Sequence, residues 1–235
     1  MPQGKSDPEA VEFSRLAGEF LVVEEKLDGT GVSLFLDEQL NLQVYHRGSP
    51  AAGKEFNELH QWSKIHQDNL YELLEDRYVL FGEWMRTKHT VYYDMLPDYF
   101  LESDMWDNRA GIWLSTNGRH SILHDHSYIT SAPVIAAFKP GSLDQLTSLI
   151  GKPKYQSNHW KDSLTDTCKQ SKILVEEALS QTDQSGLMEG LYIKHESDRH
   201  VIGRYKYVRY GFLRTILDSN SHVRDRQPIL NKKEV

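Results

Sequence analysis

A lysine that precedes an Asp-Gly turn is the first feature of this chain that indicates chemistry, in the segment Lys26-Leu27-Asp28-Gly29. A lysine amine can attack a phosphorus atom and carry the transferred group as a phosphoramidate. Its ordinary pKa of about 10.4 leaves it protonated at neutral pH, so neighbouring groups must favour the neutral amine. Because three fixed residues recur by chance in about one chain in thirty of this length, the segment needs support from the rest of the sequence.

Cationic and acidic residues downstream give that support. Arg47, Arg204 and Lys206 are candidate neighbours that would favour the neutral amine and stabilise the charge that an attacked phosphate gains. Three carboxylates lie beside glycines at the ends of predicted strands, and such hard oxygen ligands suit Mg2+ or Mn2+. The chemistry they indicate is covalent nucleotidyl transfer. The predicted catalytic residues are Lys26, Asp28, Arg47 and Lys206, and the predicted metal ligands are Asp28, Glu83 and Glu189.

Five segments follow one another in an order that resembles a known family. They are Lys26-Leu27-Asp28-Gly29-Thr30, Tyr45-His46-Arg47-Gly48, Leu80-Phe81-Gly82-Glu83-Trp84, Glu189-Gly190-Leu191-Tyr192-Ile193-Lys194 and Arg204-Tyr205-Lys206. From about Val22 to Arg209 the chain resembles the ATP-dependent RNA ligases of the phage and bacterial type. That family belongs to the wider superfamily of DNA ligases and mRNA capping enzymes.

The resemblance implies a role for individual residues. Lys26 would become adenylylated, Glu83 would bind the ribose, and Glu189 would be linked to the metal. The last motif of the family has two lysines one residue apart, whereas this chain has Arg204 and Lys206. ATP and Mg2+ (or Mn2+) are the nucleotide and the metal that the resemblance implies.

Recognition of the base is the least defined part of the predicted site. The family carries aromatic residues before a Phe-Asp pair, and here Tyr99-Phe100-Leu101-Glu102-Ser103-Asp104 keeps the aspartate but has serine before it. We predict Phe100 as the stacking residue, with a buried core phenylalanine as the alternative. Either Glu24 or Glu25 would accept from the adenine amino group. The nucleotide-binding residues are predicted to be Glu24, Glu25, Lys26, Gly29, Arg47, Glu83, Phe100, Lys194, Arg204 and Lys206.

The elements that must position these residues alternate strands with amphipathic helices. Short strands rich in Val, Leu, Phe and Tyr, broken by turn residues, are typical of antiparallel sheets. Strands are predicted at 20–26, 31–36, 42–46, 78–84, 187–195 and 200–208, and helices at 55–74, 142–150 and 163–181, with further strands between 92 and 138. We expect one α+β domain, which the resemblance makes a nucleotidyltransferase (adenylation) domain, over residues 14–210. A flexible N-terminus, 1–13, and a basic C-terminal tail, 211–235, would flank it.

Composition narrows the class of protein. The formal net charge of −7 argues against a protein that coats nucleic acid nonspecifically, although ten Lys and Arg face five Asp and Glu from Lys194 onward. No apolar run is long enough to cross a membrane, and no signal sequence begins the chain. One cysteine, Cys168, agrees with a reducing compartment. We therefore expect a cytoplasmic protein with no membrane partner.

The leading hypothesis is ATP-dependent joining of RNA that carries 5′-phosphate and 3′-hydroxyl ends, with an end-healing kinase or phosphatase as a possible partner. A DNA ligase or a capping-type guanylyltransferase is an alternative, and so is a catalytically silent RNA-end-binding protein. DNA ligases and capping enzymes usually carry arginine two residues after the glycine of the lysine motif, where this chain has Gly31. This difference favours RNA over DNA at the 3′ end.

Overall fold

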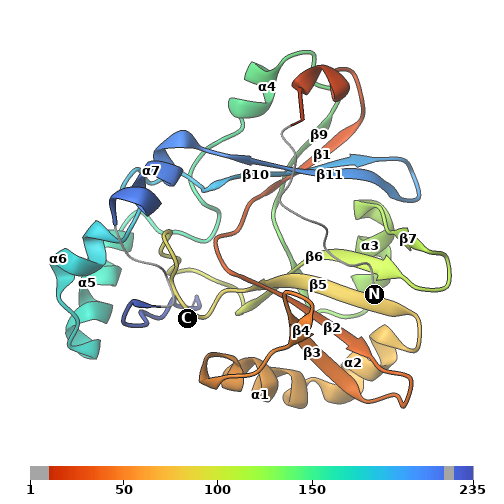
Figure 1. Cartoon of the computed structure of the whole chain (residues 1–235), viewed down its shortest axis with the longest axis horizontal. Helices are drawn as coiled ribbons and strands as arrows, with labels where there is room; N and C mark the ends of the chain where they lie inside the picture. Colours follow the sequence, from red (N-terminus) through yellow and green to blue (C-terminus); the bar gives the residue numbers. More distant parts are fainter. Residues whose placement is uncertain (1–10, 220–224, 235) are drawn as a thin grey trace.

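Two antiparallel sheets form the centre of the computed structural model, which describes residues 11–219 and 225–234. The first sheet has the order β11-β10-β1-β9, and the second has the order β4-β3-β2-β5-β6-β7, with β8 parallel to β6. The sheets lie one above the other (Figure 1). The strands are β1 (Leu21–Glu25), β2 (Thr30–Leu36), β3 (Leu42–His46), β4 (Ser49–Pro50), β5 (Tyr78–Trp84), β6 (Phe100–Asp107), β7 (Ile112–Trp113), β8 (Thr130–Ser131), β9 (Val134–Phe138), β10 (Gly190–Glu196) and β11 (Val201–Val208).

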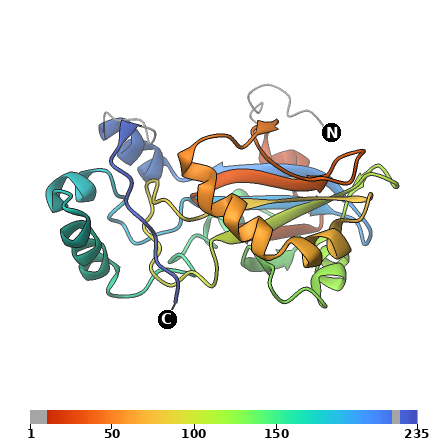
Figure 2. The same ribbon diagram turned by 90° about the horizontal axis from the view of Figure 1, so that it is seen from below.

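Helices cover the outer surfaces of the sheets. Helices α1 and α2 pack on the second sheet, α4 lies beyond the first sheet, and α5, α6 and α7 gather at one end of the molecule (Figures 1 and 2). The helices are η1 (Phe13–Arg15), η2 (Lys54–Phe56), α1 (Asn57–Ile65), α2 (Gln67–Leu74), α3 (Thr116–Leu123), α4 (Leu143–Thr147), α5 (Trp160–Ser171), α6 (Val175–Ser180) and α7 (Tyr210–Asp218). Within the described residues, no helix has the length and apolar character needed to cross a membrane.

The connection between β1 and β2 is the part of the fold that matters most for the site. Strand β1 belongs to the first sheet and β2 to the second, so residues 26–29 carry the chain from one sheet to the other. In β1, alternate side chains face the core between the first sheet and α4, where Leu21 and Val23 pack with Leu191 and Ile193. The turn after β1 therefore places Lys26 where the two sheets meet.

The largest core cluster explains why the amphipathic segment at 55–74 is helical. Leu59, Trp62, Leu70 and Leu73 face the second sheet at helical spacing, and all four are buried. The helix predicted as continuous divides at His66, whose backbone leaves the helical conformation. On both sides of this break the apolar face of the helix stays on the sheet.

Two other predictions differ from the structure. The helix predicted at 163–181 is interrupted at Lys172, which adopts a left-handed conformation with φ of 56° and closes α5 before α6 begins. Residues 116–123, within the stretch predicted as β structure, form α3. Asn-Gly pairs are typical of turns, but here the Ser115 hydroxyl accepts from the Gly118 N–H and caps a helix that contains Asn117-Gly118.

The end of the chain is packed more closely than a solvated tail would be. Helix α7 buries Phe212, and the segment 225–234 buries Ile229 and Asn231. The predicted range 211–235 thus contains ordered structure, while 220–224 and 235 lie outside the described residues. Of the predicted flexible N-terminus, residues 1–10 also lie outside them.

Candidate active site

A cavity of about 860 Å³ lies between the two sheets. The first sheet contributes Glu25, Tyr192, Arg204 and Lys206, and Lys26 follows the end of its strand β1. The segments between strands contribute Leu27, Arg47, Gly48 and Ala132, and the second sheet contributes the rest of the wall. Its lining residues from β2, β3, β5, β6 and β7 are Gly31, Val32, Ser33, Tyr45, Phe81, Gly82, Glu83, Ser103, Asp104 and Trp113.

Lys26 and Glu189 form an ion pair at the edge of this cavity. Lys26 Nζ lies 2.6 Å from Glu189 Oε1, and the Lys26 side chain keeps 22% of its surface exposed. Antiparallel pairing of Glu25 with Leu191, together with the Lys26 N–H bond to the Gly190 carbonyl, brings the two residues together. Burial alone would lower the pKa of Lys26, but Glu189, Glu83 and Asp28 outweigh it and raise the pKa above its ordinary value. The amine is therefore protonated at neutral pH.

Glu83 and Glu189 are the carboxylates best placed for a cation. Burial raises the pKa of each to about 7, although the charge of Lys26 opposes the shift. One oxygen of each, Oε2, is buried without a hydrogen-bond partner. Buried carboxylate oxygens without partners are costly unless a cation or a proton satisfies them. The pair therefore fits a hard divalent cation.

Asp28 has different partners from the other two predicted metal ligands. Its Oδ2 accepts the backbone N–H groups of Thr90 and Val91, each at 2.7 Å. The other oxygen, Oδ1, lies 3.8 Å from His89 Nδ1. No group of three His, Cys, Asp or Glu side chains arranged to hold a metal occurs within residues 11–219 and 225–234. In this conformation Asp28 binds the loop after β5, and its neighbour Gly29 is packed so closely on Met85 that a Cβ would lie 2.5 Å from the Met85 sulfur.

The three predicted cations Arg47, Arg204 and Lys206 all line the cavity. Arg47 is exposed, at the turn between β3 and β4, with φ of 49°. The guanidinium carbon of Arg204 lies over Trp113, 3.6 Å from the ring centroid, and its Nη1 lies 3.5 Å from Asp104 Oδ2. A cavity with cations on two walls and a lysine at its edge suits a polyanion such as a nucleoside triphosphate.

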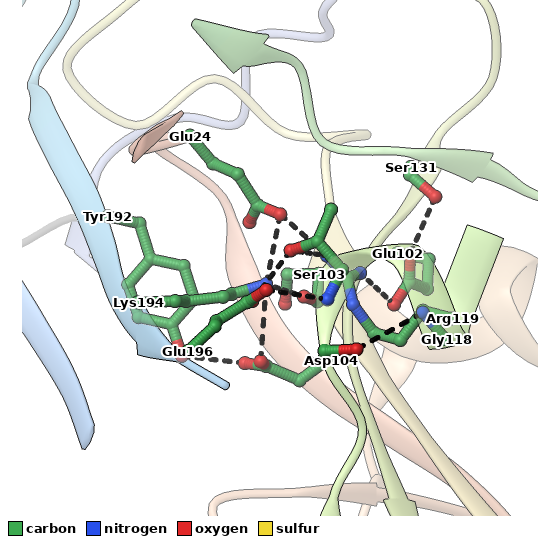
Figure 3. A network of polar contacts seen from close by, with 12 residues as sticks. Glu24, Glu102, Ser103, Asp104, Gly118, Arg119, Ser131, Tyr192, Lys194 and Glu196 are labelled. Atoms are coloured by element: carbon green, nitrogen blue, oxygen red, sulfur yellow. Dashed lines mark hydrogen bonds and ion pairs between the residues drawn. The ribbon is translucent and has the colours of Figure 1, made fainter. Parts of the chain in front are cut away.

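Glu24 and Lys194 belong to a buried polar network behind the cavity rather than to its wall (Figure 3). Lys194 Nζ lies 2.9 Å from Glu24 Oε1 and 3.3 Å from Asp104 Oδ1. Arg119, from α3, pairs with both Glu24 and Glu102, and all three side chains are fully buried. The network reaches the cavity through Asp104, whose other oxygen accepts from the Tyr192 hydroxyl at 2.6 Å.

With this geometry in place, comparison with known proteins identifies the family. The family model described as RNA ligase matches residues 19–208. The chain belongs to the RNA ligase family. That match covers β1 to β11 and so includes both sheets and every residue of the cavity wall.

Solved structures of an RNA ligase from Naegleria gruberi share the fold. One, solved with PPi, has 14% sequence identity and a TM-score of 0.61, and the match covers 87% of this chain and 53% of that chain. A mutant solved with ATP and Mn has 13% identity and a TM-score of 0.58, with 88% and 54% covered. The chain thus spans about half the length of these ligases. A search of curated proteins finds no significant match.

Within this RNA ligase fold, Phe100 is not the stacking residue that we predicted. Its side chain is fully buried, 5.0 Å from Trp62 between ring centroids, and it does not line the cavity. The alternative of a core phenylalanine is the observed one. The aromatic side chains that do line the cavity are Tyr45, Phe81, Trp113 and Tyr192.

Glu24 and Glu25, the two candidate acceptors for the adenine amino group, lie in different surroundings. Glu25 lines the cavity and accepts from the Lys154 N–H at 2.8 Å, whereas Glu24 lies in the buried network. Burial raises the pKa of Glu25 to about 7. The sequence motifs did not indicate Arg119 as a neighbour of the site, nor the hydrogen bond between Tyr192 and Asp104.

Proposed function

We propose that this RNA ligase family member joins RNA 5′-phosphate and 3′-hydroxyl ends with ATP, through an adenylate on Lys26. The observation that carries the proposal is the position of Lys26: beside Glu189, at the edge of a cavity that Arg47, Arg204 and Lys206 make cationic. A covalent nucleophile needs this combination of an accessible amine, a proton acceptor and charges that stabilise a phosphate.

In the first step, Lys26 Nζ would attack the α-phosphorus of ATP. The N–P bond forms as the bond to the bridging oxygen breaks, and pyrophosphate leaves with the electron pair. Lys26 must lose a proton, and Glu189, at 2.6 Å and with a pKa near 7, is the nearest acceptor. The cavity cations offset the charge of the transferring phosphate.

Two further transfers would use the same cavity. The RNA 5′-phosphate attacks the lysyl adenylate, which releases the amine and forms a phosphoanhydride to AMP. The RNA 3′-hydroxyl then attacks the 5′-phosphorus, and AMP leaves. Such ends would come from a kinase or phosphatase when the RNA break has other termini.

A divalent cation fits Glu83 and Glu189, because each has a buried oxygen without a partner. Bound there, Mg2+ or Mn2+ would supply positive charge that offsets the phosphates and favours the neutral Lys26 amine. Titrations that follow the metal alone, by quenching of intrinsic fluorescence with Mn2+, would test this assignment. Glu83→Gln should weaken binding at least tenfold, whereas the exposed Glu176→Gln should leave it unchanged.

Ligation of four matched nicked duplexes tests the proposed RNA specificity. The duplexes differ only in the sugar on each side of the nick, and single-turnover rates are compared. A 2′-hydroxyl that satisfies a buried polar group contributes about 1 to 3 kcal/mol, or roughly five- to a hundredfold in rate. We expect the nicks with RNA at the 3′-hydroxyl side to seal faster by this factor. Equal sealing of the all-DNA nick would instead support a DNA ligase, and transfer of GMP would support a capping enzyme.

A further inference from the structure

The C-terminal segment, residues 225–234, runs along the loop of residues 85–99 that follows β5. The Lys88 N–H donates to the Ile229 carbonyl at 2.8 Å, and the Asn231 N–H donates to the Arg86 carbonyl at 2.9 Å. The Lys232 N–H donates to the Tyr93 carbonyl at 2.9 Å. Figures 1 and 2 both show the end of the chain beside this loop, at the end of the molecule where α5 and α6 lie.

Asn231 holds two separate points of the loop with its side chain. Its Oδ1 accepts from the Tyr93 N–H at 3.0 Å, and its Nδ2 donates to the Met85 carbonyl at 2.6 Å. Asn231 is only 1% exposed. A buried amide is tolerated because its polar atoms are paired, so its loss would leave buried backbone groups without partners.

Met85 and Tyr93 also contact the turn that follows Lys26. The Tyr93 hydroxyl accepts from the Asp28 N–H at 3.1 Å, and Met85 packs against Gly29. Between them, the Thr90 and Val91 N–H groups bind the Asp28 carboxylate. The two loop residues that Asn231 holds are thus among those that support the turn directly after Lys26.

We propose that Asn231 is a positioning residue for Lys26, acting through Met85 and Tyr93. The inference rests on the proposed function, because it concerns the amine that would attack ATP. A displacement of about 1 Å in a reacting group can lower a rate by up to about a hundredfold. The cations that would bind ATP lie on other elements, so substitution at Asn231 should slow the chemical step and leave ATP affinity nearly unchanged.

The test compares Asn231→Ala with Ile229→Ala. Ile229 lies in the same segment and is buried against Tyr92 and Trp160, so its truncation destabilises the fold without removing the side-chain bonds to the loop. We expect Asn231→Ala to form the adenylate 10 to 100 times more slowly at saturating ATP, with the half-saturating ATP concentration within threefold of wild type. Ile229→Ala should keep the wild-type rate within threefold. Equal rates for the two variants in their folded fractions would overturn the proposal.

Tyr93→Phe removes only the hydroxyl and covers the case in which Asn231→Ala does not fold. Tyr93→Phe should also form the adenylate about ten times more slowly than wild type. The double variant Asn231→Ala/Tyr93→Phe should form it no more slowly than the slower of the two single variants. Multiplied losses would show that Asn231 does not act through Tyr93.

Acetylation of Lys26 by a trace amount of acetic anhydride, followed by mass spectrometry, gives a result that does not depend on ATP. Asn231→Ala should change the rate of Lys26 acetylation at least threefold, and Ile229→Ala should not. A wild-type protein that never forms an adenylate would reject the proposed function. Unchanged acetylation in Asn231→Ala would reject the positioning role.

Discussion

Lys26 Nζ and Glu189 Oε1 lie 2.6 Å apart, and this ion pair joins the turn after β1 to the start of β10. The pair holds the amine of Lys26 in its protonated form, since the negative carboxylates raise the pKa of Lys26 despite its burial. The same contact that positions the Lys26 amine therefore also keeps it protonated until its charge environment changes.

Glu189→Gln should lower the pKa of Lys26, because burial would then act with less opposition from nearby carboxylates. Competitive acetylation across pH 6 to 11 measures this titration directly. The midpoint of the Lys26 acetylation titration should move to lower pH. The rate of adenylate formation should nevertheless fall at least a hundredfold, because the variant lacks the carboxylate that would accept the proton or hold the metal. The exposed Glu176→Gln is the control and should match wild type. An unmoved Lys26 midpoint would show that the ion pair does not set its charge state.

Arg204→Lys should weaken ATP binding although it restores the residue type found in the family motif. The ammonium group of lysine cannot replace the planar guanidinium of Arg204, whose central carbon lies 3.6 Å from the centroid of the Trp113 ring. Loss of this contact is worth about 1 kcal/mol, so the half-saturating ATP concentration should rise roughly three- to tenfold. Arg77→Lys is the matched control, because Arg77 lies over Tyr78 away from the cavity. Equal effects of the two substitutions would contradict a role for the stack.

Gly190→Ala should destabilise the whole domain. A Cβ at Gly190 would lie 1.9 Å from the Tyr207 carbonyl oxygen, so β10 and β11 would have to separate. We expect the free energy of unfolding to fall by at least about 2 kcal/mol. Gly151→Ala is the control, since its nearest neighbour would be 4.0 Å away. Chemical denaturation measures both, and a Gly190→Ala protein as stable as Gly151→Ala would show that the two strands can move apart easily.

Lys88→Met should stabilise the protein at neutral pH. Burial lowers the pKa of Lys88 from 10.5 to about 8, and among the residues that the structure describes its amine donates to the carbonyls of His89 and Gln181. Arg226 donates to the same two carbonyls, so they keep a partner in the variant. Removing the buried charge should raise the free energy of unfolding at pH 7 by up to about 3 kcal/mol.

The pH dependence of that gain has a definite sign. Between pH 8 and 10.5 the unfolded chain binds more protons at Lys88 than the folded chain does, so wild-type stability rises with pH. The advantage of Lys88→Met should therefore shrink as the pH rises through this range. Denaturant titrations at pH 7 and pH 10 measure it, with exposed Lys64→Met as the control. A gain that is equal at both pH values would mean that burial does not lower the pKa of Lys88 in the folded protein.

Most of the strands were predictable from the sequence because their apolar residues are local and end at turn residues. The motif order also indicated Lys26, Glu83 and Glu189 as candidates, and their side chains gather beside the cavity. The assignment of Phe100 failed because a strand buried on both faces gives no signal of which side chain faces a ligand. In addition, β6 and β5 shift register between Phe81 and Gly82.

The C-terminal contribution could not be predicted. Residues 225–234 have no periodic pattern, and Asn231 makes its bonds to Met85 and Tyr93, far away in the sequence. The role of Arg119 could not be predicted either, because its acidic partners Glu24 and Glu102 come from two different sheets. Such long-range polar contacts depend on the tertiary fold and leave no local mark in composition or spacing.

Covalent labelling of Lys26 tests the central claim most directly. The protein is incubated with α-labelled ATP and Mg2+, denatured, and the labelled residue is identified by peptide mass spectrometry. Wild type and the exposed control Lys64→Ala should carry AMP on Lys26, Lys26→Ala should carry none, and GTP should label more weakly than ATP. Label on Lys26→Ala, or stronger labelling by GTP, would contradict the assignment of Lys26 as the nucleophile or of ATP as the nucleotide.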